Sequence, residues 1–424
     1  MNLKENGISY KYIKTDRFKT TFLSVTFYTQ LDSSAAANAL ACALMSKSTS
    51  KLPDYYAFNR KLASLYGASV SSRVDKIGDR QELHIGITVN DDKYSIDGES
   101  TVSEAGNLLL DMIFGRFIEK TDYPSSDIAR EKRLLKEAIE GKLNDKRTYA
   151  RKRAEEIMCE GEPHGLSPLG TAESVDAVTQ EDLRAAFKRL ICEAFISVVV
   201  IGAEEPCCFI SDLKRIITSV GRSYKPLLPE AVRSAGALKT VTEEMPVKQG
   251  KLVLGLRTNS GSVLPEAVKT WVMTDIFGGG PYSKLFCNVR EKLSLCYYCS
   301  ARGVRTKGLI FVESGVEIDK LGAAKEAILK ELDAVKHGDF TDTELRSSKL
   351  GLSDAFRSVE ADQQGLARWY DARILSGSDV SPKEVSRAVE AVTKEDVISA
   401  AEGFELDTVY ILSPDGSIKE EDEQ

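Results

Sequence analysis

The sequence predicts an α+β fold built from two duplicated domains, each a mostly antiparallel sheet covered by helices. The first observation is an internal repeat: residues 177–183 (AVTQEDL) recur as residues 391–397 (AVTKEDV), about half of the 424-residue chain further on. The second is that strand-like and helix-like segments come in groups, which is typical of α+β folds. Such a long repeat indicates two domains of about 200 residues each, since solenoid repeats are far shorter.

Both copies of the repeat carry the signals of a helix followed by a strand. Thr179 precedes Asp182 by three residues, and Thr393 precedes Asp396 by three. Each threonine can therefore cap a helix in a variant of the capping box. A β-rich apolar run then follows each helix, at residues 195–201 and 409–412.

The other elements of the first half are predicted from hydrophobic periodicity and from turn residues. The second helix of this half is expected to end at Gly67, a plausible C-cap. In order, the predicted elements are a strand at 21–28, helices at 33–45 and 55–65, strands at 69–74 and 81–89, and long charged helices at 103–117 and 126–160.

The second half is expected to follow the same plan. Its predicted elements are a strand at 251–257, helices at 265–277 and 283–293, strands at 296–304 and 308–318, and helices up to the last strand. A stretch rich in proline, glycine and charge, residues 221–237, is the candidate linker. The predicted domains are therefore residues 1–220 and 238–424.

Composition excludes several classes of function. The 57 basic and 64 acidic residues give a net charge of −7, so nothing in the balance of charge indicates a nucleic-acid partner. No apolar run is long enough to span a membrane, and the first residues do not form a signal peptide. The expectation is a cytoplasmic protein whose eight cysteines are reduced thiols.

Histidine usage argues against a metal centre built from histidines. The three histidines are His84, His164 and His337, and none lies near another in the sequence. Because a zinc site needs several converging ligands, each of them is expected to have a structural role.

Two further motifs are expected to be coincidental. Cys296 and Cys299 form a CxxC, but residues three apart in a strand point to opposite faces, so their sulfurs are expected to diverge. The segment from Gly278 to Lys284 lacks the ending of a phosphate-binding loop. It is expected to be a flexible loop whose backbone amides can meet an extended chain.

The run from Phe277 to Tyr297 (FGGGPYSKLFCNVREKLSLCY) resembles the second-half motif of the insulinase/pitrilysin peptidase family. That motif reads Gly-Gly-Gly, Ser-Arg-Leu-Phe, an Arg-Glu pair and Leu-Ala-Tyr. The first half follows the family order too, with residues 65–68 (LYGA) before paired strands and residues 168–171 (PLGT) before the repeat. The resemblance spans nearly the whole chain and is closest to short bacterial YmfF-type members, which share a counterpart of residues 145–150. It implies the fold of the mitochondrial processing peptidase.

The chain departs from this family where its active members hold zinc. They carry an inverted motif, His-x-x-Glu-His, on the first helix, and a glutamate ligand further along. The matching positions here are Leu40, Ala43 and Leu44, and the downstream ligand position falls on Ala138. Since these side chains carry no ligand atoms, no metal, no cofactor and no catalytic residue are expected in this part of the chain.

The second-half motif is intact. In active relatives its arginine and tyrosine act on the substrate backbone and on the developing oxyanion. The resemblance therefore implies that Arg290 and Tyr297, beside the loop of Gly278, Gly279 and Gly280, bind a peptide substrate. The alternative is that Arg290 pairs with a neighbouring acid and Tyr297 packs beneath the sheet.

Two hypotheses for function follow. The first is a non-catalytic subunit that pairs with a zinc-bearing paralogue of the same family and contributes Arg290 and Tyr297 to peptide hydrolysis. The second is a pseudoenzyme that self-associates as a dimer or acts as a structural or peptide-binding scaffold. An unrelated enzyme that uses the CxxC segment is a third, weaker alternative. Neither a nucleic acid nor a membrane is an expected partner.

Overall fold

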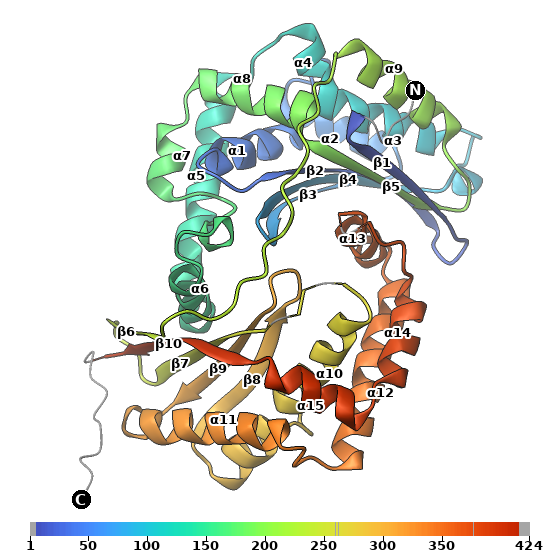
Figure 1. Ribbon diagram of the computed structural model, residues 1–424. Coiled ribbons are helices and arrows are strands. Elements are labelled where there is room, and N and C mark those ends of the chain that lie inside the picture. The colour runs from blue at the N-terminus through green and yellow to red at the C-terminus, as the bar shows by residue number, and fades with distance from the viewer. Residues whose placement is uncertain (1–5, 259, 262, 376, 415–424) are drawn as a thin grey trace, which may run out of the picture. The chain divides into compact units, whose positions relative to one another are not determined.

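The computed structural model describes residues 6–258, 260–261, 263–375 and 377–414. Two compact units make up the chain, and neither is continuous in sequence. Unit 1 contains residues 1–140, 166–229 and 361–379, and unit 2 contains residues 141–165, 230–360 and 380–424. Each unit is built on one five-stranded sheet (Figure 1).

The sheet of unit 1 has the strand order β1-β5-β2-β4-β3. Its first strand runs parallel to β5, and all its other pairs are antiparallel. Alternating side chains of β2, such as Leu23, Val25 and Phe27, join the hydrophobic core of this unit. The strands are β1 (Ile8–Lys14), β2 (Thr20–Gln30), β3 (Ser69–Ile77), β4 (Arg80–Asn90) and β5 (Phe195–Gly202).

A layer of helices covers the core face of this sheet (Figure 1). The helices of this layer are α1 (Ala35–Met45), α2 (Tyr55–Ser64), α3 (Thr101–Leu110), α4 (Arg116–Glu119), α5 (Ser125–Glu140), α7 (Ala172–Ala177), α8 (Gln180–Lys188) and α9 (Cys207–Ser219). A π-helical turn, Asp111–Gly115, joins α3 to α4, so the predicted helix at 103–117 is confirmed with this irregularity.

The sheet of unit 2 repeats the design of the first sheet. Its order is β6-β10-β7-β9-β8, so in both sheets the strands of that unit lie in the order first, last, second, fourth, third. Again only the first and last strands pair in parallel. The strands are β6 (Lys239–Glu244), β7 (Gly250–Arg257), β8 (Cys296–Val304), β9 (Leu309–Val316) and β10 (Glu405–Ser413).

Helices α10 (Glu266–Gly278), α11 (Leu321–Lys336), α12 (Asp342–Ser358), α14 (Pro382–Ala391) and α15 (Lys394–Glu402) belong to the same unit, with the π-helical segment η7 (Leu285–Lys292). The capping boxes of the repeat are both present: Thr179 caps α8 and Thr393 caps α15, each with the predicted aspartate. Because α8 precedes β5 and α15 precedes β10, the duplication that the sequence predicts is confirmed.

Each sheet also receives one helix from the opposite half of the sequence. Helix α13 (Gln363–Ile374) packs on β2 and β5 of unit 1, and α6 (Lys146–Met158) packs on β7, β9 and β10 of unit 2 (Figure 1). A linear division into residues 1–220 and 238–424 leaves out this exchange. The chain passes from unit 1 to unit 2 between Pro229 and Glu230, inside the predicted linker.

The predicted continuous helix at 126–160 is wrong, and the exchange gives the reason. Helix α5 ends at Glu140, and α6 begins after Asp145, whose side chain accepts a hydrogen bond from the backbone N–H of Arg147 at 3.1 Å. The two helices belong to different units. Hydrophobic periodicity does not show such a division, because both segments are charged and helix-forming.

A buried charge cluster attaches the segment of residues 141–165 to the sheet of unit 2. Arg257 on β7 is 5% exposed and contacts Glu162 at 2.7 Å and Asp407 at 2.8 Å. Lys307, which is 1% exposed, lies 3.3 Å from the second carboxylate oxygen of Glu162. Arg153 on α6 adds a pair with Glu243 of β6 at 2.8 Å.

Helix α13 covers a polar face of the sheet in unit 1. The buried Asp371 carboxylate accepts hydrogen bonds from Ser197 at 2.5 Å and from Thr26 at 3.0 Å. The hydroxyl oxygen of Thr26 also lies 3.0 Å from Nδ1 of the buried His84. Burial raises the pKa of Asp371 to about 7, and it lowers the pKa of His84 to about 3.

Four elements of the described residues were not predicted: strands β1 and β6 and helices α7 and α9. Strand β6 (KTVTEE) is a partly exposed edge strand without a clear apolar alternation. In β1 (ISYKYIK) Ile8, Tyr10 and Tyr12 do alternate and face the core, but the strand is short and carries two lysines. None of the helices in the described part of the chain is long and apolar enough to cross a membrane.

We predict that Asp371→Asn stabilises the protein more as the pH rises. Because the folded-state pKa of Asp371 is raised, ionisation in the unfolded chain lowers stability between about pH 4 and pH 7. Asparagine cannot ionise; its amide oxygen can accept from Ser197, and its amide N–H can donate to the hydroxyl oxygen of Thr26. The advantage in free energy of unfolding should grow across this range by about 2–4 kcal/mol.

Urea denaturation from pH 4 to pH 8 measures this difference. His84 contributes equally to both proteins, so its titration cancels. The control Asp354→Asn changes a side chain that is 63% exposed and should alter stability by no more than about 0.5 kcal/mol. A constant difference between Asp371→Asn and the parent protein would contradict the prediction.

Candidate functional site

The positions that match the zinc motif lie on α1, in the core of unit 1. Leu40 is fully buried and Leu44 is 1% exposed, whereas Ala43 is partly exposed. The helix is apolar on nearly all sides, and ten of its eleven residues are buried. Its sequence therefore favours a core helix over a helix with a polar, ligand-bearing face.

The downstream ligand position lies on α5, which packs against α1. Ala138 is exposed, and the neighbouring Glu137 forms an ion pair with Arg133 at 2.7 Å. Glu131 on the same helix is buried and paired with Arg130 at 3.1 Å. Within the described residues there is no group of three histidine, cysteine, aspartate or glutamate side chains that could hold a metal ion. The residues present do not fit zinc.

The three glycines of the second-half motif serve the packing of α10. Gly278 is buried as the last residue of that helix, so it does not lie in a flexible loop as predicted. A Cβ atom on Gly278 would lie 2.5 Å from the backbone nitrogen of Ala301 in β8, so only glycine allows this close approach. Similar contacts restrict Gly279, against Asp275 at 2.0 Å, and Gly280, against Tyr282 at 2.9 Å.

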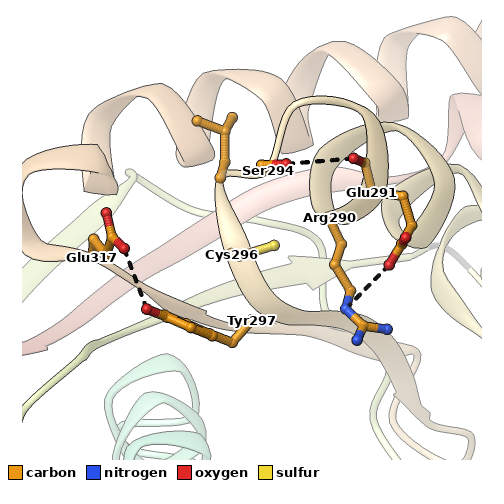
Figure 2. A pocket seen from close by; sticks show the side chains of 7 residues that line it. Arg290, Glu291, Ser294, Cys296, Tyr297 and Glu317 are labelled. Atoms are coloured by element: carbon orange, nitrogen blue, oxygen red, sulfur yellow. Dashed lines mark hydrogen bonds and ion pairs between the residues drawn. The ribbon is translucent and has the colours of Figure 1, made fainter.

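Arg290 and Tyr297 line one cavity of about 360 Å³ in unit 2 (Figure 2). Gly279 lines a different cavity, beside Trp271 and Asp275, and neither Gly278 nor Gly280 lines that of Arg290. The structure therefore brings the predicted arginine and tyrosine together and separates the glycines from them. The cavity is also lined by Glu291, Ser294, Leu295, Cys296 and Glu317.

Arg290 is only partly engaged inside the chain. It lies on η7, its side chain is 38% exposed, and its Nε atom is 3.6 Å from a carboxylate oxygen of Glu291. The guanidinium lies over the ring of Phe286, 4.6 Å from its centroid. Since a hydrogen bond is normally shorter than 3.2 Å, this ion pair leaves guanidinium donors available.

Tyr297 points outward from the edge strand β8. Its side chain is not packed beneath the sheet, as the alternative predicted, because the residue is 53% exposed. Its hydroxyl donates a hydrogen bond to Glu317 at 3.2 Å (Figure 2). Hydrogen bonds from Lys320 and from Tyr297 hold the pKa of the Glu317 carboxyl below its usual value.

The expectation that the sulfurs of Cys296 and Cys299 diverge is wrong. A β-bulge shifts the register of β8, so that Cys296 pairs with Val316 while Tyr298 pairs with Gly315. The extra residue, Tyr297, restores both cysteines to one face. Both are buried, and their thiols form a hydrogen bond.

Sequence reasoning did not identify Glu317. Glu317 directly follows Val316, the last residue of β9, which pairs with Cys296 of β8. The pairing of these two strands therefore brings Glu317 close to Tyr297. Without the register of β8 and β9, nothing near Glu317 in the sequence indicates a site.

Comparisons with known proteins agree with these features. A family model described as "Peptidase M16 inactive domain" matches residues 177–352. "Probable inactive metalloprotease YmfF" of Bacillus subtilis (strain 168) is 29% identical over 410 residues, which are 96% of each chain. The chain is therefore similar to M16 peptidases along nearly its whole length. This is the insulinase/pitrilysin resemblance that the motifs predict.

Solved structures show the same fold. A conserved protein from Enterococcus faecalis V583 has a TM-score of 0.85 at 24% identity, with 98% of each chain covered. A protein titled as a peptidase M16 inactive domain, from Pseudomonas fluorescens, has a TM-score of 0.74 at 15% identity, again with 98% of each chain covered. The chain has the duplicated α+β fold of these relatives and resembles M16 proteins that are described as inactive.

We predict that Gly278→Ala destabilises unit 2 of this M16-like chain by about 1–3 kcal/mol, because the new methyl group overlaps Ala301 and Leu285. Chemical denaturation measures the loss. Gly236→Ala is the control, because a Cβ atom there meets nothing within 4 Å and its effect should stay within about 0.5 kcal/mol. Equal stability of both variants would show that α10 and β8 are not so closely packed.

Proposed function

We propose that this chain is the zinc-lacking subunit of an M16 peptidase and that it pairs with a zinc-bearing paralogue. In this assembly the paralogue carries out hydrolysis, and this chain contributes Arg290 and Tyr297 to binding of the peptide. The observation that carries the proposal is a contrast: no zinc-motif position bears a ligand atom, yet the arginine and tyrosine share one open cavity.

The chemistry of the cavity fits a peptide backbone. A backbone presents a hydrogen-bond acceptor, the carbonyl oxygen, and a donor, the amide N–H, at nearly every residue. Arg290 and Tyr297 offer donors, and the carboxylates of Glu291 and Glu317 offer acceptors. A bound carbonyl oxygen would draw the Tyr297 hydroxyl away from Glu317, which lies 3.2 Å from it and is exposed to water.

A peptide can also find a binding edge on unit 1. Strand β3 lies at the end of its sheet and pairs only with β4, so one edge of its backbone is not used within that sheet. An extended peptide can add to such an edge as a further strand. This binding mode requires no metal ion.

The second candidate is a structural or peptide-binding scaffold that pairs with another copy of itself. One observation favours it: both residues already have partners inside the chain, Glu291 and Phe286 for Arg290, and Glu317 for Tyr297. In that case Arg290 and Tyr297 stabilise the start of β8 and do not contact a substrate.

We predict that Arg290→Ala and Tyr297→Phe each lower peptide turnover by the reconstituted pair by about two to three orders of magnitude. Each removes a donor to a carbonyl oxygen, and such a bond strengthens as that oxygen becomes negative. Neither should change the melting temperature by more than a few degrees, since both side chains are partly exposed.

The assay uses the partner that co-purifies with the full chain, identified by mass spectrometry. Matched controls are Tyr55→Phe, whose tyrosine is 66% exposed, and Arg357→Ala, whose side chain is 55% exposed and paired with Glu390. If both site variants bind the partner as the parent chain does, melt at the parent temperature and turn over peptide at the parent rate, the scaffold hypothesis replaces the proposal.

A further inference from the structure

A pair of cysteines lies in the wall of the Arg290 cavity and has no part in the proposed function. Cys296 lines the cavity, although only 9% of the residue is exposed. Cys299 lies on the same face of β8 because of the bulge, and it is 4% exposed. In Figure 2 the sulfur of Cys296 points toward the helix that carries Arg290, while Tyr297 points away toward Glu317.

The surroundings of Cys296 favour its thiolate. The bulge at Tyr297 puts the Cys299 thiol on the same face of β8, and a hydrogen bond from it reaches the Cys296 sulfur. The hydrogen bond from Cys299, with the charge of Arg290, lowers the pKa of Cys296 to about 7 despite burial. The same bond and burial raise the pKa of Cys299, which therefore remains the donor.

We propose that Cys296 is a thiol-modification site that exchanges with low-molecular-weight disulfides, and that Cys299 is the hydrogen-bond donor that stabilises its thiolate. The cavity of about 360 Å³ gives a small reagent access to a sulfur that is otherwise buried. Arg290 on its wall offers a guanidinium to the carboxylates that many small biological thiols carry.

The chemical step is a thiol–disulfide exchange. The Cys296 thiol loses its proton to water, and the thiolate attacks one sulfur of the reagent, R–S–S–R. A bond forms between Cys296 Sγ and that sulfur as the original S–S bond breaks. Cys296 is oxidised to a mixed disulfide, while the other half of the reagent is reduced and leaves as a thiolate that takes up a proton.

The other cysteines differ from Cys296 in burial or in surroundings. Burial raises the pKa of Cys42 to about 12, and it also raises the pKa of Cys192. Cys207, Cys208 and Cys287 are exposed, so a reagent can reach them without a cavity. They must be replaced before the reactivity of Cys296 can be measured.

The test uses the full chain with Cys207, Cys208 and Cys287 changed to serine, and glutathione disulfide as the probe. Intact-mass spectrometry from pH 5.5 to pH 9.5 follows formation of one adduct, and peptide mapping locates it. The expected adduct is on Cys296, with a midpoint near pH 7. No peptide or partner is required, so the result does not depend on the proposed function.

Two variants test whether Cys299 lowers the pKa of the Cys296 thiol. Cys299→Ala removes the donor and should shift the midpoint of adduct formation toward pH 9. The rate of adduct formation at pH 7 should fall about fivefold, because the smaller fraction of Cys296 thiolate is partly offset by the higher nucleophilicity of that thiolate. Cys299→Ser keeps a donor and should restore the low midpoint.

Circular dichroism should show that both variants remain folded. The proposal is overturned if Cys296 gains no adduct, if the midpoint is the same with alanine as with cysteine at position 299, or if a Cys296–Cys299 disulfide forms in place of the adduct.

Discussion

The exchange of helices between the two sheets is the constraint on which the rest of the fold depends. Residues 141–165 and 361–379 each complete a unit that is otherwise built from the opposite half of the sequence. The first segment is held by the buried cluster of Arg257, Glu162, Asp407 and Lys307. Removing one partner from a buried charge pair commonly costs about 3–5 kcal/mol, because the other charge is left buried without its partner. Duplication alone would give two independent domains, whereas exchange makes each half of the sequence necessary to both units.

Local signals in the sequence were sufficient for most of the fold. The capping threonines Thr179 and Thr393 mark equivalent helices because a side-chain cap depends on residues within one turn. What could not be predicted depends on contacts between distant segments. The break after Glu140 reflects tertiary contacts of α6, and the bulge at Tyr297 depends on the pairing of β8 with β9. For the same reason the placement of Arg290 and Tyr297 in one cavity came from a family resemblance, whereas Glu317 was not found at all.

The zinc-motif positions on α1 and the second-half motif of unit 2 are held in the structure by different interactions. On α1, leucines at the positions that hold histidines in active relatives pack into the core, so the helix is held mainly by hydrophobic burial, with Asn38 hydrogen-bonded to Gln81 and Arg189. Polar functional sites generally lower the stability of a protein. A helix that binds no metal ion can therefore be fully apolar. In unit 2 Gly278 allows α10 to approach β8 closely, and this contact requires no metal ion. An M16-like chain with an apolar α1 and an arginine and tyrosine in one cavity can therefore keep the family fold.

The central claim is that catalysis has been lost at the zinc motif of this chain while the fold has been kept. The most direct measurement is elemental analysis of the purified chain after incubation with excess zinc and removal of unbound metal, with an unstructured peptide offered to the same sample. The account predicts no stoichiometric zinc and no cleavage from a chain that melts cooperatively. One tightly held equivalent of zinc per chain, with peptide hydrolysis that a chelator abolishes, would contradict it.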